Sequence, residues 1–125
     1  MARRIKFKGW TPYMTARVSV EGFRPTESSR FAVARVSAKA AWDLLHVRSG
    51  MPVNSLLPAL PRPLTMADKL AVAAAWEAQT HLDWSAFDAL EELGPSSNKR
   101  QHLDPATAAP TIAAMRQLAA QTLEA

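Results

Sequence analysis

The sequence contains no cysteine among its 125 residues. Disulfide scaffolds, thiolate metal sites and cysteine nucleophiles are therefore excluded. The four glycines are too few and too scattered to form a phosphate-cradling or dinucleotide-binding loop. No apolar run approaches the roughly 18 residues of a membrane helix, and the segment from Met1 to Lys8 lacks the apolar stretch of a signal peptide. We therefore expect a cytoplasmic protein with no cofactor and no membrane contact.

Patterns typical of catalysis and of metal binding are also weak. The chain has no Gly-x-Ser-x-Gly turn, and its three histidines, His46, His81 and His102, fall on separate predicted elements. Glu77 and His81 are spaced four apart, as two metal ligands on one helix face can be, but the same spacing is typical of an ordinary helical ion pair. We favour the ion pair, and we expect no enzyme activity, no catalytic residue and no metal site.

The apolar content of 48% overstates the core that the chain can build. Alanine supplies 24 of the 60 residues behind that figure, and only 26 are Leu, Ile, Val or Phe. A modest core suits a single domain spanning residues 1–125. The four tryptophans, Trp10, Trp42, Trp76 and Trp84, are expected mainly in that core, with anchoring of a partner as the alternative.

Charge is distributed unevenly along the chain. Residues 1–50 carry ten Lys or Arg side chains against three acidic ones, giving +7, whereas residues 51–125 carry five against eight, giving −3. Such polarity in a small chain is typical of a surface that meets nucleic acid or another acidic partner. It is equally compatible with solvated strand faces balanced by an acidic helical half. Arginine outnumbers lysine ten to five and alanine is abundant, which suggests a bacterial or phage coding sequence rich in G and C.

The first third of the chain, which lies within the basic, β-rich half 1–50, has the alternation of β-structure. Strands are predicted around Ile5 and Phe7, over Thr15–Val20 and over Arg30–Val36, with turns at Gly9-Trp10-Thr11-Pro12 and from Gly22 onward. The period then changes to that of a helix between Ser37, a candidate N-cap, and Gly50, a candidate residue just past the helix end. We expect this helix to pack on the three strands.

The remainder of the chain combines a proline-rich connection, residues 51–63, with an acidic helical half, residues 64–125. Four prolines in the connection exclude a long regular element there. Thr65-Met66-Ala67-Asp68 resembles a capping box at the start of a helix that reaches about Leu82. Further helices are predicted from Ser85 to Gly94 and from Pro105 or Pro110 to the C-terminus. The expected fold is α+β: an N-terminal three-stranded antiparallel sheet with a packed helix, followed by a small C-terminal helical cluster.

One stretch is similar in outline to a known family. Arg30 to Leu57 reads as a strand, a helix, a glycine turn and then Asn54-Ser55-Leu56-Leu57, which resembles the order of a ribbon-helix-helix DNA-binding unit. Pro58 and Pro61 fall where the second helix of that family runs, and proline breaks a helix interior. We assign the chain to no family on this outline.

The N-terminal segment is the best candidate for a binding surface. Its cations alternate with aromatic residues, combining charges for phosphate with flat rings on which bases stack. Neighbouring strands extend the basic face, because every second side chain of a strand points to the same side. The candidate nucleic-acid-binding residues are Arg3, Arg4, Lys6, Lys8, Trp10, Tyr13, Arg17 and Arg35.

Two functions remain open for this segment. The first is a small non-enzymatic nucleic-acid-binding accessory protein that uses the basic, aromatic-interleaved sheet face. The second is a protein-interaction module of phage or mobile-element origin, an inhibitor or assembly component, whose basic half binds an acidic protein surface. A purely structural role is the alternative to both, with the aromatic rings in the core and the cations protecting an edge strand from pairing.

Overall fold

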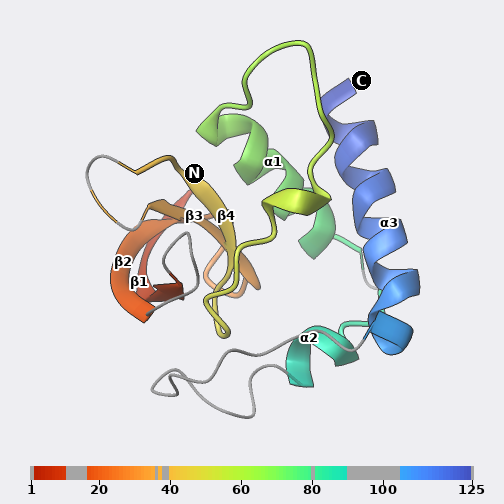
Figure 1. Cartoon of the computed structure of the whole chain (residues 1–125), viewed down its shortest axis with the longest axis horizontal. Coiled ribbons are helices and arrows are strands. Elements are labelled where there is room, and N and C mark those ends of the chain that lie inside the picture. The colour runs from red at the N-terminus through yellow and green to blue at the C-terminus, as the bar shows by residue number, and fades with distance from the viewer. Residues whose placement is uncertain are drawn as a thin grey trace.

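Figure 1 shows the computed structural model, which describes residues 2–10, 17–35, 37, 40–79, 81–89 and 105–124. Within these residues the chain is α+β, and its strands form one antiparallel sheet in the order β1-β2-β3-β4. The strands are β1 (Arg3–Trp10), β2 (Arg17–Arg24), β3 (Phe31–Arg35) and β4 (Asp43–His46). The antiparallel sheet is confirmed, whereas the expected count of three strands is wrong.

The fourth strand replaces part of the helix that was expected between Ser37 and Gly50. Asp43–His46 pairs with β3, placing Leu44 opposite Val33 and His46 opposite Phe31. Gly50 has a φ of 69° and its N–H donates to the carbonyl of His46 at 2.8 Å, which closes a tight turn after β4. A left-handed glycine ends helices and closes hairpin turns alike, so this signal does not distinguish the two. Because β4 stands where the first helix of a ribbon-helix-helix unit was expected, the similarity to that family is not confirmed.

The first two strands extend beyond their predicted ends. Gly9 and Trp10 belong to β1 rather than to a turn, and Gly22 lies inside β2 rather than in the following loop. At the end of β1 the N–H of Trp10 donates to the carbonyl of Gly50 at 3.0 Å. This bond joins the first strand to the turn after the last one, so the sheet curls like part of a barrel (Figure 1).

The inner face of the curled sheet holds a compact apolar cluster. It is made of Val20, Ala34 and Leu45, with Phe7 and Val18 packed beside them. Two small residues, Gly22 of β2 and Ala34 of β3, pair directly on this face and let the two strands approach closely. A glycine in a strand interior is typical of a position where another backbone approaches closely.

Replacing Gly22 with alanine is expected to destabilise the protein by about 1–3 kcal/mol, as overpacking does. A Cβ at this position would collide with the carbonyl oxygen of Val33 and lie 2.7 Å from Cβ of Ala34. Gly9 is the matched control, since the nearest atoms that its Cβ would meet belong to side chains, Cδ1 of Leu45 at 3.2 Å and the two methyl groups of Val20 at 3.4 and 3.5 Å. Urea denaturation of both variants measures the difference. Equal losses for Gly22→Ala and Gly9→Ala would contradict a close approach at Gly22.

The rest of the described chain is a short 3₁₀ turn, η1 (Asn54–Leu56), and three helices, α1 (Met66–Glu77), α2 (Ser85–Ala89) and α3 (Pro105–Glu124). The capping box is confirmed, because Thr65 and Asp68 exchange side-chain-to-backbone hydrogen bonds at the start of α1. The predicted C-terminal cluster is wrong, since the C-terminal part, as far as the structure describes it, is the single helix α3, which runs through Pro110. No described helix combines the length and hydropathy needed to cross a bilayer.

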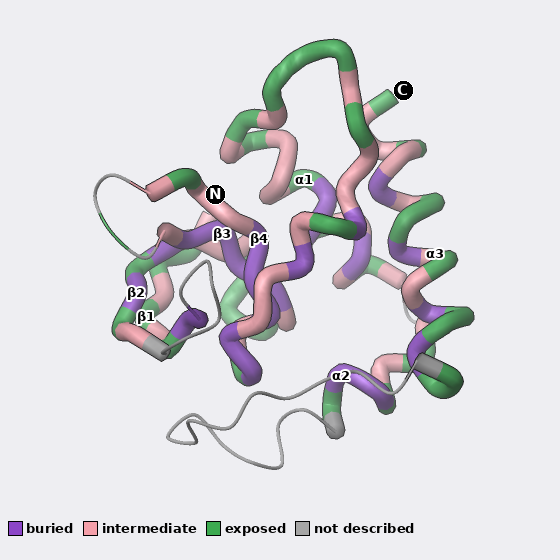
Figure 2. Tube along the Cα trace, in the orientation of Figure 1, coloured by how far each residue is buried: buried purple, intermediate pink, exposed green. Residues whose placement is uncertain are grey.

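The main core lies between the helices and the outer face of β3 and β4. Phe31, Val33 and Leu44 point from the strands toward the helices, which contribute Trp76 from α1 and Met115 from α3. Buried segments of the sheet and of α1, α2 and α3 face one another in Figure 2. The helices thus cover the β3–β4 half of the outer face.

Candidate functional site

Strand register brings three of the predicted cations together on the outer face of the sheet. Arg4 and Lys6 alternate along β1 and are both exposed. Lys6 pairs with Glu21 of β2, and Glu21 pairs in turn with Arg35 of β3. Directly paired residues of antiparallel strands point to the same side. The three cations therefore follow one face across three strands, next to the part that the helices cover.

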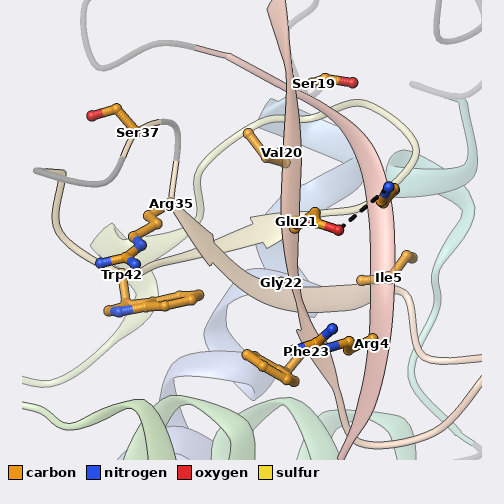
Figure 3. Close-up of a pocket in the computed structure, with 11 residues that line it drawn as sticks. Arg4, Ile5, Ser19, Val20, Glu21, Gly22, Phe23, Arg35, Ser37 and Trp42 are labelled. Atoms are coloured by element: carbon orange, nitrogen blue, oxygen red, sulfur yellow. Dashed lines mark ion pairs between the residues drawn. The ribbon is translucent and has the colours of Figure 1, made fainter.

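A cavity of about 780 Å³ opens on this face (Figure 3). We call it the basic groove, and it is lined by Arg4, Ile5, Lys6, Ser19, Val20, Glu21, Gly22, Phe23, Arg35, Ser37 and Trp42. Its floor is formed by the first two strands, and Arg35, Ser37 and Trp42 form its opposite side. Its size falls within the range of about 300–1,000 Å³ that is usual for ligand pockets.

The charged side chains of the groove sum to three cations minus one carboxylate, or +2. The carboxylate of Glu21 lies 3.5 Å from the ammonium of Lys6, and the side chains are 69% and 80% exposed. An ion pair this exposed stabilises a fold by very little. Both groups are therefore available to a ligand. Lys8, exposed on the same face of β1, lies beyond the lining residues.

One wall of the groove is aromatic. The rings of Phe23 and Trp42 lie 6.0 Å apart at an angle of 42°, and the guanidinium carbon of Arg35 lies 4.7 Å from the centre of the Trp42 ring. Lys69 of α1 donates to the backbone carbonyl of Trp42. This hydrogen bond fixes the segment that carries the ring.

The local sequence patterns do not predict this aromatic pair. Phe23 is two residues after Glu21 and therefore points to the same face of β2. This position can be predicted from the sequence once β2 is extended to Arg24. Trp42 carries no such signal, because its place beside Phe23 depends on β4 and on the turn that precedes it.

The other predicted site residues lie elsewhere. Arg3 is on the opposite face of β1, paired with Arg24, and lines a second hollow with residues 25–28. Trp10 is only 5% exposed, so its indole presents little surface to a ligand. Arg17 pairs with Trp10 at the start of β2, but its side chain and the whole of Tyr13 lie outside the described residues.

Among the residues that the structure describes, the titratable groups considered for catalysis do not converge. The carboxylate of Glu77 accepts hydrogen bonds from the side chains of Thr26 and Ser28. Glu77 therefore binds the loop between β2 and β3 rather than His81. His102 lies outside the described residues. Within the described ranges, no group of three His, Asp or Glu side chains is arranged to hold a metal ion.

His46 is the one described histidine in the core. It is fully buried, with Nδ1 2.8 Å from the hydroxyl of Ser49 and its ring 5.5 Å from that of Phe31. Burial lowers the pKa of His46 to about 4. The ring is therefore neutral near pH 7 and lies in the main core, away from the basic groove.

No protein-family model, curated protein or solved structure matches this chain. A functional assignment therefore rests on the residues of the basic groove. The groove offers three cations, an aromatic wall and a single carboxylate. Its cations suit a ligand with negative charges, and its aromatic wall suits a ligand with flat rings.

Proposed function

We propose that the protein is a small, non-enzymatic nucleic-acid-binding accessory protein and that the basic groove is its binding surface. The observation that carries the proposal is the convergence of Arg4, Lys6 and Arg35 on one recess that also holds aromatic rings. Cations on neighbouring strands match successive phosphates of a nucleic-acid backbone, and rings beside them match its bases. The +7 charge of residues 1–50 favours the same ligand over long range.

Affinity for nucleic acid of random sequence is expected to fall steeply with salt. Neutralising three phosphates gives a slope of about −2 to −3 in a plot of log affinity against log salt. Fluorescence anisotropy of a labelled oligonucleotide, titrated between about 50 and 200 mM salt, measures this slope. Undetectable binding at about 50 mM salt would overturn the proposal and favour an acidic protein as the partner.

Two pairs of variants localise the effect. Arg4→Ala is expected to weaken binding. It should also make the slope of log affinity against log salt shallower by about 0.7–0.9, the contribution of one phosphate. Arg3→Ala is the matched control, because it removes the same charge from the opposite face of β1. Lys6→Ala and Glu21→Gln remove opposite charges from one exposed ion pair, so the first should weaken binding and the second strengthen it. Equal effects of Arg3→Ala and Arg4→Ala would place the binding surface elsewhere.

A protein-interaction module is the second candidate, favoured by the position of β1. In the sheet formed by the described strands, β1 lies at the edge, with eight residues and exposed cations at Arg4, Lys6 and Lys8. Acidic extended segments can add to such an edge through backbone hydrogen bonds. Like charges oppose the same pairing between two copies of this chain.

A further inference from the structure

The aromatic wall of the basic groove is held in place before any ligand arrives. Trp42 packs against the main core on one side and is half-buried, so part of its ring system remains accessible. Its backbone carbonyl is bound by Lys69, and Phe23 is fixed by its pairing with Val33 in the sheet. A preorganised surface loses little conformational entropy when a ligand binds to it.

Arg35 joins this wall to the cations of the groove. Its guanidinium lies over the ring of Trp42, while its strand position pairs it with Glu21 across the groove floor. A guanidinium plane stacked on an indole offers a second flat, charged surface on which a base can stack. Arg4 lies at the same end of the groove as Phe23, its partner in the register (Figure 3).

We propose that the groove takes single-stranded nucleic acid, with one unpaired base stacked against the wall of Phe23, Trp42 and Arg35. Arg4 and Lys6 then bind the phosphates that flank this base. The inference rests on the proposed function and adds the substrate class and the stacking position. A base within a duplex is stacked on both faces and cannot enter the recess, whereas an unpaired base can turn out of its strand.

Three labelled probes of about 15 nucleotides test the substrate class. They are a single strand of thymidines, a duplex of random sequence and a strand of abasic sites that keeps the phosphates but lacks the bases. The single strand is expected to bind more tightly than both others at the same salt concentration. A duplex or abasic strand that binds as tightly as the single strand would overturn the inference while leaving nucleic-acid binding intact. Failure of all three probes would overturn the proposed function as well.

A pair of tryptophan variants tests the stacking position. Trp42→Leu is expected to weaken binding of the thymidine strand by about 5- to 140-fold, the usual effect of losing one stacked base, and to leave binding of the abasic strand unchanged. Trp84→Leu is the matched control, because Trp84 also packs on the core and also lies under an arginine, with the Arg30 guanidinium carbon 4.9 Å from its ring centre. It is not part of the groove.

The result depends on folded variants, which thermal melts of both proteins establish. Phe23→Leu supplies a second test of the same wall if Trp42→Leu does not fold, and the same selective loss is expected for it. Equal losses from Trp42→Leu and Trp84→Leu, or an unchanged affinity of both groove variants for the thymidine strand, would overturn the stacking position.

Discussion

Replacing Trp76 with alanine is expected to lower the free energy of unfolding by about 3–5 kcal/mol. The side chain is completely buried in the main core, and its indole N–H donates to the carbonyl of Met115 in α3 at 2.9 Å. Its ring meets that of Phe31 edge-on, with centroids 5.0 Å apart. Trp76 thus connects α1 to both α3 and the sheet. A domain of this size is stable by only about 5–15 kcal/mol, so the loss is a large share of the total.

Urea or guanidinium denaturation of the Trp76→Ala protein measures this loss. Trp76→Phe keeps an aromatic ring but removes the hydrogen bond to Met115, so it is expected to cost less than the alanine variant. Ala67→Gly, at an exposed position in the first turn of α1, controls for effects on the helix alone and should cost at most about 1 kcal/mol. A cost for Trp76→Ala no larger than that of the control would mean that the ring does not join these elements.

Stability is expected to fall as the pH drops from about 6.5 to about 4, because of His46. Burial lowers the pKa of this ring from 6.5 to about 4; the carboxylate of Asp88 acts in the opposite direction, and the cations of Arg30 and Arg48 lower it further. Between these two pH values the unfolded chain binds a proton on His46 and the folded chain does not. Proton binding therefore favours the unfolded state, by about 3 kcal/mol in total once the lower pKa is reached.

Denaturation curves at several pH values, recorded for the unmodified protein and for His46→Gln, isolate this contribution. Carboxylates titrate in part of the same range in both proteins, so the informative quantity is the difference between their free energies of unfolding. The unmodified protein should lose its advantage over His46→Gln as the pH falls. His81→Gln makes the same substitution at an exposed histidine and is the matched control. If the free energy of unfolding of His46→Gln fell with pH as steeply as that of the unmodified protein, His46 would not be the cause of the loss.

Several elements of the fold could be predicted from local sequence because their causes are local. Alternating cations and apolar residues specify β1, and the Thr65–Asp68 capping box specifies where α1 begins. The prolines between residues 51 and 63 exclude a long element, and only the three-residue turn η1 forms there. Each of these signals acts within a few residues of the chain and needs no distant partner.

The fourth strand could not be predicted in the same way. Asp43–His46 is four residues long and its apolar residues fit a buried strand or a helix face equally well. Pairing with β3 decides between them, since Leu44 and His46 find their partners at Val33 and Phe31, more than ten residues away. The end of β2 was missed for a related reason, because Gly22 is typical of a loop until the close approach of Val33 shows why glycine is there.

For the candidate site, sequence by itself determined the supply of charge, and tertiary structure decided which charges meet. Alternation placed Arg4 and Lys6 on one face of a strand, as predicted. The curl of the sheet and the bond from Trp10 to Gly50 accompany the burial of Trp10, which removes most of its ring from solvent. Register between three strands, together with the turn leading into β4, set Phe23, Arg35 and Trp42 beside those cations. Such contacts join residues distant in sequence, so no local pattern encodes them.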